Sequence, residues 1–282
     1  MSEASFQPIL GCFGDPLAGN PMQLLMERAF KAASLDWRFL SLEVPTERFA
    51  EAMRGARAMG FRGAAFASPH QIGALAFVDS LTPAAEAAGA VNCAVRQGEQ
   101  WVGENTDGAG FLQVLKPIAA PTGMPVVICG AGGTARAIAT ALAGLAPASI
   151  TIVNRTIERA EMLAAKLRER FELPIESLPW HDRWAIPAET RLLVHATTAG
   201  WCDPDDGPTF DWSAADPELI VADVIFNPAE TRLLAEATKR GHRIVSGVDM
   251  MAAQAELAYR FWTGSDPAAG ILHETLEEYL EV

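Results

Sequence analysis

The residues best suited to chemistry form a glycine-rich turn near the middle of the 282-residue chain. An apolar stretch at 126–129 leads into this turn, and a run of helix formers at 136–142 follows it. This setting of strand, turn and helix fits the G-x-G-x-x-A pattern of dinucleotide-binding sites. The residues of the pattern are Gly130, Ala131, Gly132, Gly133, Thr134 and Ala135.

Three small residues of the turn each have a physical task. Gly130 would make the tight turn, Gly132 would let the backbone approach a pyrophosphate, and Ala135 would let the helix pack closely on the strand. The N–H groups at the start of that helix would then point at the phosphates. The alternative is a tight turn without a ligand, and it explains fewer of these features. We therefore expect a dinucleotide cofactor.

The end of the second strand in this region indicates which dinucleotide to expect. NAD sites usually place an acidic residue about 20 residues after the glycine turn, where it binds the ribose. This chain has Asn154, Arg155 and Thr156 there, with Arg159 one helical turn later. A guanidinium group suits a 2′-phosphate, so the pattern favours NADP. Arg159 has an alternative interpretation as a solvated helix-start residue beside Glu158.

Short apolar runs alternate with helical patterns along the chain, which is typical of an α/β fold. Thr82 and Pro83 predict a helix N-cap followed by a first-turn proline. Strands are expected at 8–13, 37–44, 63–67, 90–95 and 100–103, and helices at 22–33 and 46–59.

In the second half of the chain, expected strands alternate with helices in the way that is typical of a doubly wound Rossmann sheet. Two helices are expected within 250–282, separated at 263–267. The chain therefore contains two domains by this interpretation, and a cleft between domains is a common place for a small ligand. The expected strands of this half lie at 126–129, 150–154, 192–196, 220–225 and 243–246.

Composition narrows the class of protein and of partner. The chain has 22 Lys and Arg against 35 Asp and Glu, a net charge of −13, which disfavours nucleic acid as a partner. Its cysteines, Cys12, Cys93, Cys129 and Cys202, are spread without a CxxC pair, so we expect neither disulfides nor a metal site. No signal peptide or membrane segment is apparent, and a cytoplasmic protein that does not bind membranes is expected.

The chain carries a series of short segments at 14–16, 60–63, 69–70, 89–92, 105–108, 130–135, 154–156, 227–228 and 247–254. Taken together, they resemble the shikimate dehydrogenase family over nearly the whole chain. The resemblance implies reversible hydride transfer between NADP(H) and a shikimate-like cyclic hydroxy acid, in aromatic amino acid biosynthesis. It also implies a substrate domain at 1–107 that is completed by the C-terminal helices at 251–282, with an NADP domain at 108–250.

The departures from the family pattern lie mainly among the polar groups that would contact substrate. Gln71 stands where the family has a catalytic lysine, and Ala67 stands where it has a threonine. The S-x-S pair that resembles a carboxylate-binding element falls on Asn20 and Met22. Since each unpaired buried polar group costs about 1 to 3 kcal/mol, shikimate itself should bind poorly.

Two further departures lie in the second half, where Phe226 replaces a family tyrosine and His195 replaces an asparagine. The core interpretation of His195 is favoured over contact with nicotinamide. Other family positions are retained. By resemblance, Asn92 and Gln254 contact substrate, as the replaced positions 20, 22, 67 and 226 would, and Val224 and Gly247 join the cofactor site.

Catalysis has to proceed without the lysine if this alignment holds. Asp107 matches the family aspartate and could take the substrate's hydroxyl proton directly or through water, although it could also cap the following helix. His70, beside Gln71, has the intrinsic pKa range for proton transfer, but a surface or helix-capping imidazole is the more common situation.

Three functions remain open on the sequence. The first is an NADP-dependent oxidoreductase with an altered small-molecule substrate, acting as a monomer or homodimer. The second is a catalytically silent NADP-binding sensor or assembly protein, which the glutamine at position 71 motivates. The third is a weak but authentic shikimate dehydrogenase.

Overall fold

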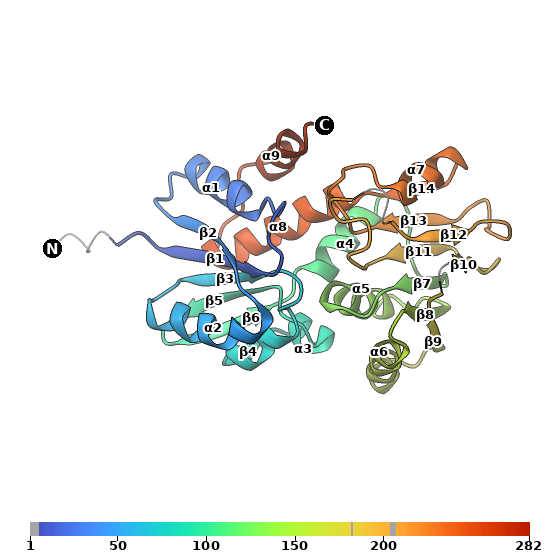
Figure 1. Ribbon diagram of the computed structural model, residues 1–282, viewed down its shortest axis with the longest axis horizontal. Helices are drawn as coiled ribbons and strands as arrows, with labels where there is room; N and C mark the ends of the chain where they lie inside the picture. Colours follow the sequence, from blue (N-terminus) through green and yellow to red (C-terminus); the bar gives the residue numbers. More distant parts are fainter. Residues whose placement is uncertain (1–5, 182, 204–206) are drawn as a thin grey trace. The chain divides into compact units, whose positions relative to one another are not determined.

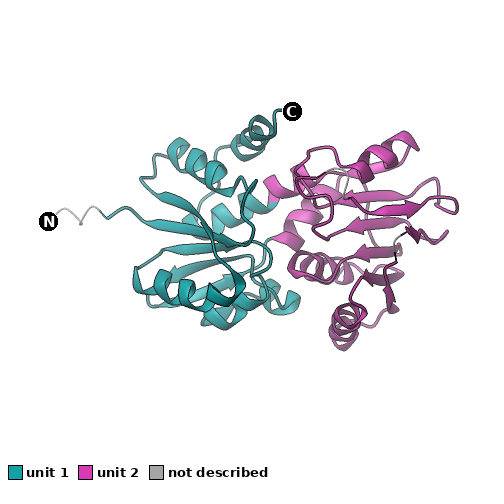
Figure 2. Ribbon diagram, viewed as in Figure 1, with its two compact units in different colours: residues 1–106, 254–281 teal, residues 107–253, 282 magenta. Residues whose placement is uncertain are grey.

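The computed structural model describes residues 6–181, 183–203 and 207–282, and the chain divides into two compact units (Figure 2). Unit 1 comprises residues 1–106 and 254–281, and unit 2 comprises residues 107–253 with residue 282. The first unit is therefore built from both ends of the chain, with the second inserted between them. The expected boundaries at 107 and 250 differ from these by one and three residues.

Unit 1 contains a mixed six-stranded sheet in the order β2-β1-β3-β5-β6-β4. Strands β2, β1 and β3 run parallel, while β3, β5 and β6 form antiparallel pairs. Its strands are β1 (Ile9–Gly14), β2 (Arg38–Glu43), β3 (Gly63–Phe66), β4 (Ser80–Leu81), β5 (Cys93–Gln97) and β6 (Gln100–Glu104). The helices of this part are α1 (Met22–Ala32), η1 (Thr46–Arg48), α2 (Phe49–Ala58), η2 (Gly73–Phe77) and α3 (Pro83–Ala88).

The C-terminal helices complete the core of unit 1 (Figure 1). They are α8 (Gly247–Thr263), whose residues from Gln254 onward belong to this unit, and α9 (Ile271–Leu280). The indole of Trp262 is buried, packs on Phe39 and donates a hydrogen bond from Nε1 to the carbonyl oxygen of Ala94 at 2.9 Å. The end of α8 is thereby fixed to two strands of the sheet.

Unit 2 contains a six-stranded parallel sheet in the order β14-β13-β11-β7-β8-β9. This is the doubly wound arrangement, in which the chain order reverses between β7 and β11. The strands are β7 (Pro125–Cys129), β8 (Ser149–Asn154), β9 (Ile175–Pro179), β11 (Leu192–His195), β13 (Ile220–Asp223) and β14 (Arg243–Val245). The helices are α4 (Asp107–Leu115), α5 (Gly133–Ala143), α6 (Ile157–Arg170) and α7 (Arg232–Lys239).

Alternate residues of these strands enter two separate apolar clusters, one on each face of the sheet. On β7, for example, Val126 and Ile128 belong to the cluster under α5 and α6, whereas Val127 and Cys129 belong to the cluster under α7. Burial on both faces explains why the strands read as continuous apolar runs rather than as alternating patterns.

The structure confirms the α/β class, the Rossmann sheet and the return of the C-terminal helices to the first unit. Thr82 caps α3 as expected, because its Oγ1 accepts a hydrogen bond from the Ala85 backbone N–H at 3.3 Å. The expectations omitted the edge strands β4 and β9. They also omitted a small parallel pair, β10 (Arg183–Ala185) and β12 (Thr209–Asp211).

Candidate functional site

The glycine turn joins the carboxyl end of β7 to the start of α5, in unit 2. Gly130 has φ of +125°, and a Cβ built on it would lie 2.4 Å from the carbonyl oxygen of Ala196, so this position excludes any side chain. Gly132 is the N-cap residue of α5, and a Cβ on it would meet no atom within 4 Å. The turn therefore leaves open space in front of the positive end of a helix, which suits a pyrophosphate.

The remaining residues of the turn hold the start of α5 against the sheet. Ala135 is fully buried and Ala131 is nearly so, and both belong to the apolar cluster under α5. Gly133 is the first residue of the helix, and Thr134 follows it. The residues of the predicted pattern thus divide into those that pack the helix on the sheet and those that border the open space.

The segment after β8 presents positive charge. Asn154 closes the turn by donating a hydrogen bond from Nδ2 to the Thr156 carbonyl oxygen at 2.8 Å. Arg155 and Arg159 are exposed, one before α6 and one in its first turn. This is the arrangement expected for a group that binds an anionic ligand from solvent.

Arg136 was not among the predicted cofactor residues. Its side chain is half-buried on α5, and burial together with the nearby charge of Arg159 lowers the pKa of its guanidinium group. Cations brought together in this way are stabilised by an anion. The sequence signal for it was an arginine directly after the glycine turn.

Val224 directly follows β13, and Gly247, the first residue of α8, approaches the backbone of the residues on either side of it. The backbone N–H of Val224 donates to the His195 carbonyl oxygen at 3.0 Å. A Cβ on Gly247 would lie 2.1 Å from the carbonyl oxygen of Ile225, so α8 begins in close backbone contact with this segment. Only glycine permits that approach.

Asp107 is the first residue of α4 and is nearly buried, with 5 % of its surface exposed. Its Oδ2 accepts a hydrogen bond from the Thr134 hydroxyl at 2.8 Å. Close packing of α4 on α5 makes this contact possible, because a Cβ on Gly108 would lie only 2.6 Å from the Ala137 carbonyl oxygen. The predicted catalytic carboxylate is therefore held by a residue of the predicted cofactor turn.

In unit 1, Asn92 and Gln254 come together with Thr106, which was not predicted. Asn92 donates from Nδ2 to Thr106 Oγ1 at 2.8 Å and accepts from the Thr106 backbone N–H at 2.9 Å. Thr106 Oγ1 in turn donates to Gln254 Oε1 at 3.2 Å. All three are buried, so this polar cluster is a pre-arranged set of hydrogen-bonding groups rather than a solvated surface.

The segment after β3 carries Ala67, His70 and Gln71. His70 is 2 % exposed, stacks on the Phe49 ring with 4.1 Å between ring centroids, and donates from Nε2 to the Val44 carbonyl oxygen at 2.7 Å. The interpretation of His70 as a surface or helix-capping group is therefore wrong. Gln71 is partly buried, and its backbone carbonyl oxygen accepts a hydrogen bond from Val91.

Asn20 and Met22 lie at the start of α1. Asn20 Oδ1 accepts a hydrogen bond from the Met22 backbone N–H at 3.0 Å. Met22 is buried, with 6 % of its surface exposed. The asparagine therefore stabilises the helix start, and the thioether side chain is part of the apolar interior.

Phe226 is buried and meets the Trp201 ring edge-on, with 4.5 Å between ring centroids. His195 is fully buried, and both of its ring nitrogens have partners. The favoured interpretation of His195 as a core histidine with satisfied hydrogen bonds is confirmed. Trp201 and the partners of His195 were missed, because they are paired through space and not by a sequence motif.

Two classes of site are absent from the part of the chain that the structure describes. No group of three or more His, Cys, Asp or Glu residues there is arranged to hold a metal ion. No helix among the same residues has the length and apolar character needed to cross a membrane.

Comparisons with known proteins agree with this architecture. Residues 13–94 match the model of the shikimate dehydrogenase substrate binding domain, and residues 116–189 match that of shikimate / quinate 5-dehydrogenase. The chain is 36% identical to the shikimate dehydrogenase (NADP(+)) of Geobacter sulfurreducens, over 95% of both chains. It is 37% identical to that of Methanopyrus kandleri, over 96% of both.

Solved structures extend the comparison to related activities. The ligand-free 5-ketofructose reductase of a Gluconobacter strain superposes with a TM-score of 0.86 and 36% identity, covering 98% of this chain and 99% of that one. The shikimate 5-dehydrogenase of Thermus thermophilus, in complex with NADP(H) and shikimate, gives 0.83 and 30%, covering 97% and 100%. The chain therefore belongs to the shikimate dehydrogenase family of NAD(P)-dependent oxidoreductases.

Proposed function

We propose that the protein is an NADP-dependent oxidoreductase whose substrate is a small polyhydroxylated ketone or alcohol other than shikimate. The observation that supports this proposal most strongly is the pair of replaced residues in the segment after β3. There Gln71 and Ala67 occupy the positions that resemblance assigns to a lysine and a threonine, while Asp107, Asn92 and Gln254 are kept. The substrate-binding groups are altered, but a proton-accepting carboxylate remains.

The glycine turn fits the cofactor, because the open space before α5 and the arginines after β8 match a pyrophosphate and a 2′-phosphate. We assign the pyrophosphate to the turn at 130–134 and the 2′-phosphate to Arg155 and Arg159, with Arg136 as a third cation. A bound nicotinamide ring would supply or accept the hydride. The absence of an acidic residue at the end of β8 favours NADP over NAD.

Asp107 is assigned the proton transfer. In the direction of alcohol oxidation it accepts the hydroxyl proton as the C–H hydride leaves, and in ketone reduction it returns that proton to the oxygen. A carboxamide cannot accept a proton at neutral pH, so Gln71 is assigned to substrate binding only. Thr134 orients the carboxylate through the 2.8 Å hydrogen bond to Oδ2.

The polar cluster of Asn92, Thr106 and Gln254 is assigned to the substrate's hydroxyl groups. Met22 has a thioether in place of a hydroxyl and is buried, so it offers a substrate carboxylate no hydrogen-bond donor, and a substrate without a carboxylate fits better. The 36% identity to a 5-ketofructose reductase across almost the whole chain supports a ketose-type substrate. The chain is equally similar to shikimate dehydrogenases. A weak but authentic shikimate dehydrogenase is therefore the second candidate.

The test is binding of NADPH, NADP and NAD by calorimetry, followed by turnover with shikimate, quinate, 5-ketofructose and a panel of cyclic hydroxy acids. We expect NADP to bind more tightly than NAD and a ketose to turn over faster than shikimate. Preference for shikimate would support the authentic enzyme. Tight NADPH binding without turnover on any substrate would support the silent sensor, which the glutamine at position 71 motivates.

A further inference from the structure

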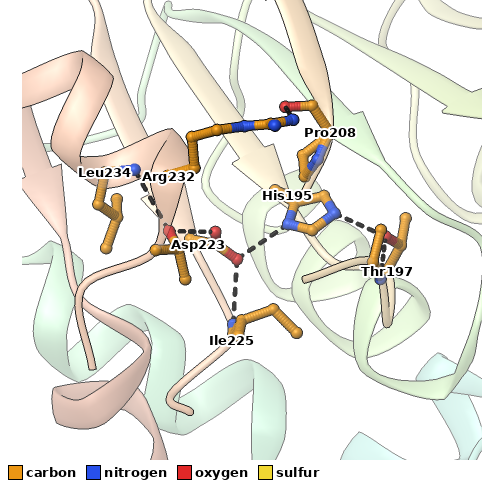
Figure 3. A network of polar contacts seen from close by, with 9 residues as sticks. His195, Thr197, Pro208, Asp223, Ile225, Arg232 and Leu234 are labelled. Carbon is orange, nitrogen blue, oxygen red and sulfur yellow. Dashed lines mark hydrogen bonds and ion pairs between the residues drawn. The ribbon is translucent and has the colours of Figure 1, made fainter. Parts of the chain in front are cut away.

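A buried chain of hydrogen bonds in unit 2 has no role in the mechanism above (Figure 3). Its centre is Asp223, which is 3 % exposed. One carboxylate oxygen accepts from His195 Nδ1 at 2.9 Å and from the Ile225 backbone N–H at 3.0 Å, and the other accepts from the Thr231 hydroxyl at 2.8 Å. Because a carboxylate only accepts, this arrangement places a proton on Nδ1 of the imidazole.

The second imidazole nitrogen points the opposite way, toward Thr197 (Figure 3). Nε2 lies 2.6 Å from Thr197 Oγ1, and the same oxygen accepts a hydrogen bond from the Ala199 backbone N–H at 3.1 Å. With the proton on Nδ1 of a neutral ring, Nε2 accepts and the threonine hydroxyl donates. Every group in the chain from Asp223 to Ala199 is then satisfied, and the segment 197–199 is held in one conformation.

This segment follows β11, and β11 pairs with β7 where the strand order of the sheet reverses. Dinucleotides bind outside the carboxyl ends of the strands at such a reversal. A Cβ on Gly130, which follows β7, would lie 2.4 Å from the Ala196 carbonyl oxygen and 3.4 Å from Thr197 Cγ2. The glycine turn therefore lies directly against the segment 197–199, which is hydrogen-bonded to His195, at the point where the strand order reverses.

We infer that His195 is a positioning residue for the nicotinamide half of the cofactor, acting through Thr197. The inference rests on the proposed NADP function. If the 2′-phosphate binds at Arg155, after β8, the adenosine half occupies that side of the sheet, and the nicotinamide half faces the segments after β11 and β13. Asp223 orients the imidazole of His195. The imidazole in turn holds Thr197 in the segment that the nicotinamide half of the cofactor would contact.

The experiment compares two ligands on matched variants. Thr197→Val removes the hydroxyl at nearly constant volume, Thr197→Ser keeps it, and His195→Phe keeps a ring but removes both nitrogens. Affinity is measured for NADPH and for adenosine 2′,5′-bisphosphate, which has the adenosine half alone. We expect Thr197→Val and His195→Phe to weaken NADPH binding by about tenfold, the loss of one good hydrogen bond. Binding of the bisphosphate and of NADPH to Thr197→Ser should stay at the wild-type level.

Adding Thr197→Val to His195→Phe should cause no further loss, because both changes remove the same contact. Unchanged NADPH affinity in both single variants would overturn the inference. Equal weakening of both ligands would also overturn it, because it would show a merely structural role. Failure of the wild-type protein to bind NADPH would contradict the proposed function itself, so the two failures are distinguishable.

Discussion

The hydroxyl of Thr134 donates a hydrogen bond to the carboxylate of Asp107, with 2.8 Å between Oγ1 and Oδ2. The two residues are 27 positions apart, at the starts of α5 and α4. The contact links a turn expected to bind phosphates to a group expected to move a proton. Its first consequence is that the orientation of Asp107 depends on the start of α5.

Thr134→Val should lower kcat on whichever substrate turns over, because Asp107 loses a donor that orients it. A hydrogen bond to a charged group contributes about 1.5 to 3 kcal/mol, which corresponds to a loss of roughly tenfold to a hundredfold. Thr134→Ser keeps the hydroxyl and should remain close to wild type. Steady-state kinetics would show this difference, and equal kcat for the valine and serine variants would contradict it.

Asp107→Asn should reduce kcat by about 10² to 10⁴-fold, the usual contribution of a positioned general base. The substitution preserves size, so the affinity for NADPH should be retained. Calorimetry and turnover measured on the same preparation separate the two effects. A variant with nearly wild-type turnover would show that another group carries the proton.

Restoring the family loop should change the substrate preference. The double variant Gln71→Lys and Ala67→Thr supplies the amine and hydroxyl that resemblance assigns to these positions. If Asp107 and the polar cluster already fit the reacting ring, shikimate turnover should rise by at least about tenfold. The control is Gln71→Met, which has similar length without the charge. If shikimate turnover does not rise above that of this control, the site does not share its substrate geometry with shikimate dehydrogenases.

Arg155→Ala should weaken NADP binding by roughly tenfold to a hundredfold while leaving NAD binding unchanged, since only NADP carries the 2′-phosphate. Arg170→Ala, at the opposite end of α6, is the matched control. Calorimetric titrations with both dinucleotides measure the discrimination. Equal weakening of NAD would assign Arg155 to a different part of the cofactor.

The thiols should differ sharply in reactivity. Burial raises the pKa of Cys12 to about 12 and that of Cys129 well above its usual value, and Cys93 is buried as well. Cys202 is exposed, and partial desolvation raises its thiol pKa. Because the thiolate reacts, labelling of Cys202 should accelerate as pH rises toward that pKa. An Ellman titration should find one reactive thiol in the native protein and four after denaturation, and Cys202→Ser should remove the native one.

The sequence predicted the parts of the site that depend on local backbone geometry. Gly130 and Gly132 were found because a strand, a tight turn and a helix are contiguous in the chain, and the arginines after β8 followed from a fixed spacing. Short edge elements such as β10, three residues long, are too brief for hydrophobic periodicity to show.

Contacts between distant elements could not be predicted in the same way. His70 is buried because the ring of Phe49, from α2, stacks on its imidazole. No residue near position 70 in the sequence indicates that Phe49 is its partner. The pairing of Asp107 with Thr134 likewise depends on how closely α4 approaches α5. Such contacts follow from tertiary packing, which a single sequence does not display as a motif.

The indole of Trp262, buried against Phe39 and hydrogen-bonded to the Ala94 carbonyl oxygen, comes from a helix that the ribosome makes after all the strands of unit 2. Domains generally fold as the nascent chain emerges, N-terminal first. Here the N-terminal half must wait with an incomplete core until residues 254–281 have been synthesised, whereas the inserted half can close earlier. The half expected to recognise substrate can thus complete its core only after the inserted half has been made, and a chain cut short before Trp262 would lack the indole that joins α8 to the sheet of unit 1.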